Sequence, residues 1–207
     1  MDLLRAGRKT VVPLVIMSIN WFIATMVYYG ITFGIQFMSN VNLFVIGIVQ
    51  ALAELIGVIS SACWANWLGR KKAIICNHLC LGLACFSFQL ALYFSAPSWV
   101  YLICILVGKY CSTAGFNIIY LITSELFPTN FRGTVFGMTN FVARIGGILA
   151  PLIDYEMQNS FMFVFTVSSF VSVVISFFLS ETKGKEIPDT LDQPLSPKEG
   201  APPLSSN

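Results

Sequence analysis

Six long apolar runs, separated by short polar segments, dominate this sequence. Each run has about 20 residues or more, and a helix rising 1.5 Å per residue would then cross a hydrocarbon layer of about 30 Å. The runs lie roughly at Val11–Gly34, Leu43–Trp64, Ala73–Phe94, Trp99–Thr123, Thr134–Tyr155 and Ser160–Ser180. They are almost continuously apolar, whereas barrel strands are shorter and alternate. The pattern predicts an all-α, polytopic membrane bundle of six transmembrane helices.

The composition excludes several other classes of protein. Of 207 residues, 56% are hydrophobic and only 11% are charged, whereas about a quarter of a soluble domain is charged. A soluble enzyme core, a disordered chain and a nucleic-acid reader are therefore excluded, and the net charge of +2 predicts no nucleic-acid partner. The six cysteines lie in or beside apolar runs, so no disulfide framework is expected. No metal site and no cofactor is predicted. An intramembrane enzyme is not expected either, because the sequence offers no nucleophile–base pair.

The polar segments differ sharply in charge. Ten Lys and Arg residues lie in alternate segments, and none lies in the other three. The basic segments are 1–10, 65–72, 124–133 and 181–207, and the segments without a basic residue are 35–42, 95–98 and 156–159. By the positive-inside rule both termini are expected in the cytoplasm. We divide the chain into a cytoplasmic linker end (1–10), a six-span domain (11–180) and a disordered cytoplasmic tail (181–207), which is rich in Pro, Ser and charge.

Three charged clusters lie on the predicted cytoplasmic face. The first follows a bend at Gly69, the second surrounds Pro128, and the third closes the last run. Clusters of opposite charge can form a salt-bridge network that locks helices in one conformation and releases them in another. The predicted cytoplasmic gate comprises Gly69, Arg70, Lys71, Glu125, Arg132 and Glu181.

These clusters resemble the motifs of the major facilitator superfamily and of its organic ion transporter family. The matching stretches are Gly69-Arg70-Lys71, Glu125-Leu-Phe-Pro-Thr-x-x-Arg132 and Glu181-Thr-Lys-Gly184. The resemblance covers residues 1 to about 191 and implies the second six-span half of a twelve-span carrier, with a 3+3 inverted repeat. The family usually has Asp where this chain has Asn66, and Gly where it has Ala62. The missing carboxylate predicts a weaker gate.

Three charges lie inside the apolar runs at similar depth. Glu54, Lys109 and Arg144 are each about 15–17 Å from a membrane surface, near the midplane. Such charges are costly in a bilayer and usually functional. Glu54 can pair with either Lys109 or Arg144, and either pairing leaves one cation over. Because an unpaired buried charge is costly, the remaining cation is expected to be reached by water or by an anionic ligand.

Aromatic residues accompany these charges and complete a predicted substrate site. Its members are Arg144, Lys109, Tyr28, Tyr29, Phe116, Tyr120 and Glu54. Aromatic rings beside a cation can hold a flat organic anion, although ordinary core packing of the rings remains the alternative, and Trp21 is assigned to the core. The resemblance implies that the Arg144 position is basic in organic anion carriers, that the Lys109 position is basic in all, and that Glu54 pairs helices.

We expect a plasma-membrane transporter of small organic ions that works by alternating access. Organic anions are favoured, with zwitterions and cations as open alternatives. The expected partners are the substrate, the lipid bilayer, and a matching N-terminal six-span half or another carrier chain. The alternative is a truncated, non-transporting isoform that acts as an assembly or regulatory partner of full-length carriers.

The charge asymmetry predicts a topology that labelling can test. A cysteine introduced at Ser39 or Ser98 should react with an impermeant thiol reagent added outside intact cells, because both residues lie in segments without a basic residue. A cysteine at Lys71 should react only after permeabilisation. Labelling of Lys71→Cys from outside would refute the orientation.

Overall fold

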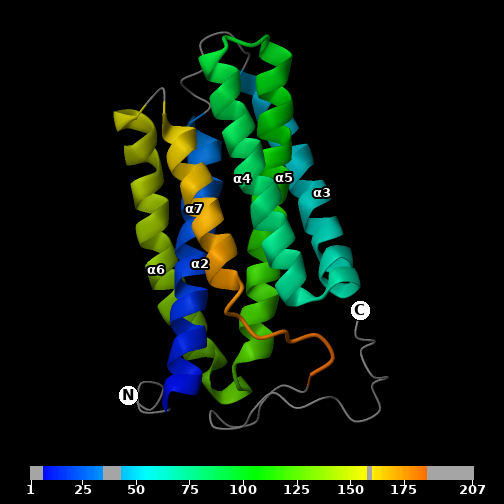
Figure 1. Cartoon of the computed structure of the whole chain (residues 1–207), viewed down its shortest axis with the longest axis vertical. Coiled ribbons are helices and arrows are strands. Elements are labelled where there is room, and N and C mark those ends of the chain that lie inside the picture. Colours follow the sequence, from blue (N-terminus) through cyan, green and yellow to red (C-terminus); the bar gives the residue numbers. More distant parts are fainter. Residues whose placement is uncertain (1–6, 35–42, 158–159, 186–207) are drawn as a thin grey trace.

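The computed structural model describes residues 7–34, 43–157 and 160–185, and it is a bundle of six helices within these ranges (Figure 1). The helices are α2 (Gly7–Gly34), α3 (Leu43–Leu68), α4 (Arg70–Tyr93), α5 (Ser98–Leu126), α6 (Thr129–Glu156) and α7 (Phe161–Ser176). The predicted all-α membrane bundle is thereby confirmed. Residues 1–6 of the predicted linker end and 186–207 of the predicted tail lie outside the described residues. We call the end where α2 begins the inner end and the opposite one the outer end.

The helix boundaries differ from the apolar runs mainly at the inner end. Helix α2 begins at Gly7, α5 continues to Leu126 and α6 starts at Thr129, because helices extend into polar residues that a hydropathy window does not count. Helices α2 to α6 are long and apolar enough to span a membrane. Helix α7 has only 16 residues. Three i→i−3 hydrogen bonds then continue it as a tighter turn to Leu179.

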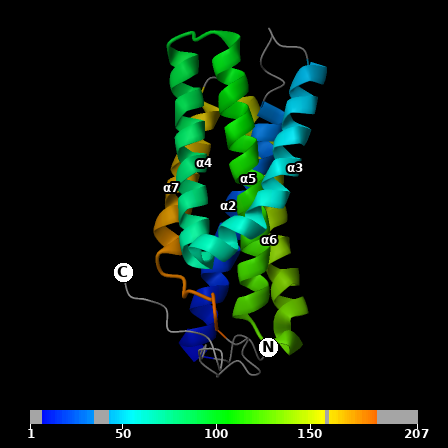
Figure 2. The same ribbon diagram turned by 90° about the vertical axis from the view of Figure 1, so that its right-hand side faces the viewer.

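The packing of the helices follows an internal symmetry. The main helix pairs are α2·α6, α4·α7, α4·α5 and α3·α5, followed by α2·α5 and α2·α7. Exchanging α2 with α5, α3 with α6 and α4 with α7 turns this set of pairs into itself. Because α2 starts at the inner end and α5 at the outer end, the two halves run in opposite directions (Figures 1 and 2). This is the arrangement of a 3+3 inverted repeat.

Polar contacts in the buried interior fix helix α2 to α5 and α7. The Trp21 indole N–H donates to Thr123 Oγ1 of α5 at 3.1 Å. Asn20 Oδ1 accepts hydrogen bonds from Ser172 at 2.6 Å and Ser176 at 3.2 Å, both on α7. Trp21 and Asn20 are fully buried, so these bonds satisfy groups that would otherwise be costly in an apolar interior. The assignment of Trp21 to the core is confirmed.

Glycines let α6 approach α2 closely. A Cβ on Gly146 would lie 2.5 Å from the Phe22 carbonyl oxygen, and one on Gly147 would lie 3.2 Å from the Tyr29 ring. Small residues at helix crossings in membranes allow this backbone contact. The α2–α6 seam therefore depends on the absence of a side chain at Gly146.

We predict that Gly146→Ala destabilises the chain by about 1–3 kcal/mol, because the added methyl meets backbone rather than a movable side chain. The matched control on the same helix is Gly137→Ala, where nothing lies within 4 Å of the added Cβ. Thermal unfolding of the purified chain in detergent, followed by tryptophan fluorescence, measures both variants. Equal stability of the two would contradict the close α2–α6 contact.

Candidate functional site

A buried ion pair lies in the middle of the bundle. Lys109 Nζ of α5 is 2.8 Å from Glu54 Oε1 of α3, and the two side chains are 1% and 35% exposed. Of the two partners that the sequence left open for Glu54, the structure pairs it with Lys109. Because breaking a buried pair leaves an uncompensated charge, this contact is a strong constraint between α3 and α5.

Helix α2 completes the surroundings of Lys109. The ammonium donates to Thr32 Oγ1 at 2.6 Å and lies 3.5 Å from the centre of the Tyr28 ring, a cation–π contact. The Tyr28 hydroxyl in turn donates to Glu54 Oε1 at 2.8 Å. A carboxylate, a hydroxyl and a ring face therefore surround the Lys109 charge. These partners come from the chain itself, so Lys109 is compensated without a ligand.

Arg144 does not join this pair. It lies on α6, is exposed, and makes no hydrogen bond or ion pair within the described residues. The sequence predicts the three charges at one depth, but depth does not determine the direction in which a side chain points. Of the three charges, only that of Arg144 has no partner of opposite charge among the described residues.

A concavity of about 360 Å³ opens beside the ion pair, between α2, α3 and α5. It is lined by Tyr28, Tyr29, Glu54, Val58, Thr113, Phe116 and Asn117. The space suits part of a small organic molecule, since ligand pockets are typically about 300–1,000 Å³. Four of the predicted substrate residues line it, namely Tyr28, Tyr29, Phe116 and Glu54. Lys109 lies behind its wall, and Arg144 is not among the lining residues.

Sequence reasoning missed two polar members of this wall. Thr113 and Asn117 follow Lys109 by four and eight residues on α5, so they share its helix face with Phe116. Thr113 Oγ1 is buried without a partner among the described residues, and the Asn117 amide donates only to its own helix at the Thr113 carbonyl. Helical spacing from Lys109 was the signal that could have identified both.

An aromatic series connects the concavity to the inner half of the bundle. Ring centroids lie 5.4 Å apart for Tyr28 and Tyr29, 6.1 Å for Tyr28 and Phe116, and 5.4 Å for Phe116 and Tyr120. Tyr120 also packs edge-on against Trp21 at 4.3 Å. Tyr120 therefore lies inward of the concavity rather than in its wall, and its ring is partly a core contact.

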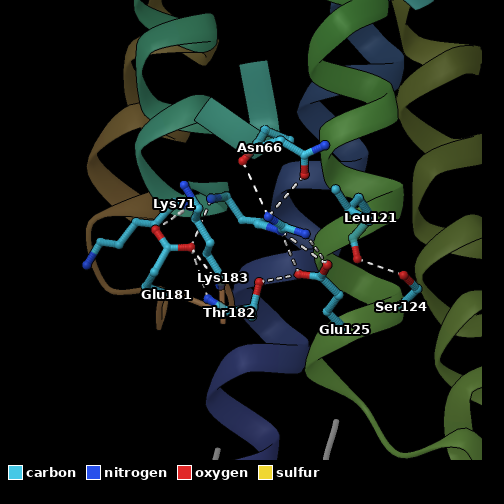
Figure 3. Close-up of polar contacts among 10 residues, drawn as sticks. Asn66, Lys71, Leu121, Ser124, Glu125, Glu181, Thr182 and Lys183 are labelled. Atoms are coloured by element: carbon cyan, nitrogen blue, oxygen red, sulfur yellow. Dashed lines mark hydrogen bonds and ion pairs between the residues drawn. The ribbon is translucent and has the colours of Figure 1, made fainter. Parts of the chain in front are cut away.

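The inner end carries a compact charged network (Figure 3). The Arg70 guanidinium makes a bidentate contact with Glu125, with Nη2 to Oε1 at 2.8 Å and Nε to Oε2 at 3.0 Å. The Thr182 hydroxyl donates to the same carboxylate. Bidentate Arg–carboxylate contacts are stronger and more directional than simple ion pairs. The network joins the start of α4, the end of α5 and the segment after α7.

Glu181 closes the network by capping α4. Its carboxylate accepts the backbone N–H groups of Arg70 at 2.9 Å and Lys71 at 3.2 Å. A helix N-terminus carries free N–H donors and favours negative charge. Gly69 adopts φ of +89°, and a Cβ there would lie 2.8 Å from the Glu181 carboxylate. The positive φ strains any other residue at this turn, and an added Cβ would displace the carboxylate that caps α4.

Five of the six predicted gate residues meet in this inner network: Gly69, Arg70, Lys71, Glu125 and Glu181. Arg132 does not join it. Its Nε and Nη2 atoms are buried without a partner in the described part of the chain. Asn66, which stands where the family usually has Asp, makes only a long 3.4 Å contact to Arg70 Nη1.

Comparison with known proteins places the chain in a family. The family model for the Major Facilitator Superfamily matches residues 3–151. Solute carrier family 22 member 6-B of Xenopus laevis is 29% identical over 186 residues, covering 87% of this chain and 33% of the relative. The organic cation transporter protein of Drosophila melanogaster is 28% identical, covering 92% and 35%. The solute carrier family 22 member 15-like protein of Xenopus laevis is 31% identical, covering 86% and 37%.

A solved structure shares the fold. The proton:xylose symporter XylE, bound to 6-bromo-6-deoxy-D-glucose, superposes with a TM-score of 0.71 at 17% identity, covering 90% of this chain and 42% of XylE. This chain spans about a third of the length of the first relatives it matches. The inverted-repeat packing, the charged inner network and the family model agree, and the chain belongs to the major facilitator superfamily, with relatives among its organic ion transporters.

Proposed function

We propose that this chain forms one wall of a plasma-membrane carrier that moves small organic ions, organic anions in preference, by alternating access. The observation that carries the preference is the balance of the three charges within the apolar helices. Lys109 is compensated by Glu54, whereas Arg144 has no partner among the described residues. One positive charge therefore remains to attract an anionic substrate. The organic ion transporters among the relatives support the general assignment.

A second wall is part of this proposal. The concavity is open on one side, and α3 exposes large apolar side chains along most of its length, among them Leu52, Leu55 and Ile59. Arg144 is also exposed, on α6. A matching six-span half that covered the exposed faces of both α3 and α6 would enclose the substrate and bring Arg144 into the same pathway. Another carrier chain could supply the same cover.

The inner network provides the gate in this proposal. It connects α4, α5 and the segment after α7 through Arg70, Glu125 and Glu181. In this proposal, opening toward the cytoplasm separates these ends, which breaks the bidentate contact and uncaps α4. The network therefore favours the state that is closed at the inner end.

The first test concerns Arg144 in an assembled, functional carrier. Arg144→Asp changes the sum of the three charges from +1 to −1 and leaves the Lys109–Glu54 pair in place. We expect uptake of a fluorescent organic anion such as fluorescein to fall at least about tenfold, equivalent to about 1.4 kcal/mol. Uptake of tetraethylammonium should rise relative to the anion, because the new carboxylate repels anions.

Arg144→Lys is the matched control. It keeps the charge but loses the planar fork, so intermediate anion uptake is expected. Surface expression is measured for both variants, so that a folding defect is not read as a loss of recognition. If Arg144→Asp reaches the surface and carries the anion as well as the parent, Arg144 does not determine selectivity.

The second test concerns the gate. Glu125→Gln removes the charge that Arg70 binds and should weaken closure at the inner end. We expect a cysteine at Asn117, in the wall of the concavity, to be labelled from the cytoplasmic side at least about threefold faster in Glu125→Gln than in the parent. Labelling is measured in inside-out vesicles, after subtraction of the signal from native cysteines. An unchanged rate would show that the network does not gate access.

A further inference from the structure

A carboxyl group with no partner is buried near the outer end of α6. Asp154 is 1% exposed, and neither carboxyl oxygen makes a hydrogen bond among the described residues. Buried polar groups are nearly always paired, and each exception calls for an explanation. Asp154 takes no part in the ion pair, the concavity or the inner network described above.

Asp154 lies on the face of α6 that forms the seam with α2. The buried positions Ala143, Gly146, Ala150 and Asp154 follow one another at three- and four-residue spacing, which is one helix face. Gly146 touches the α2 backbone at Phe22, and Asp154 is eight residues, about 12 Å, further outward along the same face. We call the part of the α2–α6 contact from Gly146 to Asp154 the outer seam.

No cation is available to compensate Asp154. On α2 the titratable residues of the outer half are Tyr28, bound to Glu54, and Tyr29. On α5, which packs less on α6, they are Lys109, bound to Glu54, and Tyr101, which donates to the Ala91 carbonyl. Tyr110, whose hydroxyl accepts hydrogen bonds from Ser60 and Trp64, and the thiols Cys104 and Cys111 complete the set in the outer half of this helix, and none of these is a cation. Helix α7 has no titratable residue, and segments 35–42, 95–98 and 156–159 contain no Lys, Arg or His. On α6 itself, Arg144 lies ten residues inward, and Tyr155 and Glu156 are exposed.

We propose that Asp154 is a proton-binding site and that its protonation allows the outer seam to close. Burying an unpaired carboxylate is strongly unfavourable, whereas the neutral acid avoids most of that cost. The closed seam therefore holds the carboxylic acid. When the seam opens, water reaches the group, the O–H bond breaks, and the proton passes to external water and leaves a hydrated carboxylate. In the carrier proposed above, on which this last step rests, outward opening is linked to release of a proton.

Infrared spectroscopy of the chain in liposomes tests the protonation directly, since the carbonyl of a carboxylic acid absorbs apart from that of a carboxylate. The parent at pH 7 should show a carboxylic acid band that Asp154→Asn lacks. The matched control Glu156→Gln removes an exposed acid two residues further along α6 and should keep the band. Absence of the band in the parent, or its persistence in Asp154→Asn, would overturn the proposal.

The pH dependence of stability provides a second test of the protonation of Asp154. An acid that is neutral when folded and ionised when unfolded stabilises the fold at low pH, and this contribution is lost as the pH rises. The folding equilibrium constant of the parent should therefore fall, by at most about tenfold per pH unit. Asp154→Asn should lose this dependence and Glu156→Gln should keep it. The same slope in Asp154→Asn as in the parent would contradict the site.

If Asp154→Asn fails to fold, Asp154→Glu retains the acid and should shift the infrared band rather than remove it. A band that Asp154→Glu leaves unmoved belongs to another residue and overturns the proposal. Neither measurement uses transport, so a failed carrier assignment and a failed proton site give different results.

Discussion

The pairing of Lys109 with Glu54 is the constraint on which the rest of the site depends. An ammonium that is 1% exposed must have a partner, and α3 supplies the carboxylate while α2 supplies Thr32 and the Tyr28 ring. Three helices are thereby held around one charge. The concavity lies where these same helices meet, so its wall includes two members of the cluster, Tyr28 and Glu54.

This pairing also determines which charge remains. With Glu54 committed to Lys109, Arg144 has no acidic partner among the described residues. In the proposed carrier, therefore, not every basic residue needs to touch the substrate. One buried pair can serve as scaffold while a second, exposed cation supplies attraction. This division of roles follows from burial rather than from residue type, since both residues are basic.

Much of the fold could be predicted from the sequence, because a bilayer restricts the choice to helices of a certain length. Hydropathy identified the helices within a few residues, but not the early end of α7, where i→i−3 bonds replace helical ones. Depth along a helix was predictable as well, from 1.5 Å per residue. Rotation about the helix axis was not. For that reason the sequence left the partner of Glu54 open, and it gave no indication that Asp154 is buried rather than exposed like its neighbour Glu156.

The inner network also shows what the sequence could not predict, here at the turn before α4. The motif residues predicted that Gly69, Arg70, Glu125 and Glu181 act together, and they meet in the structure (Figure 3). The sequence alone could not tell which glutamate binds the Arg70 side chain and which caps α4. Glu125 and Glu181 both carry a carboxylate, and both lie in motifs on the same face of the bundle. The left-handed backbone at Gly69 decides this, since it presents the first N–H groups of α4 to Glu181.

A double-mutant cycle tests the central claim most directly, namely that Lys109 is committed to Glu54 and that Arg144 is not. Thermal stability of the purified chain would be compared for Glu54→Gln, Lys109→Met, the double variant and Arg144→Gln. We predict that each single change at the pair lowers stability, that the double variant recovers most of the loss, and that Arg144→Gln matches the parent. A double variant no more stable than the worse single one, or an Arg144→Gln variant as unstable as Glu54→Gln, would contradict the account.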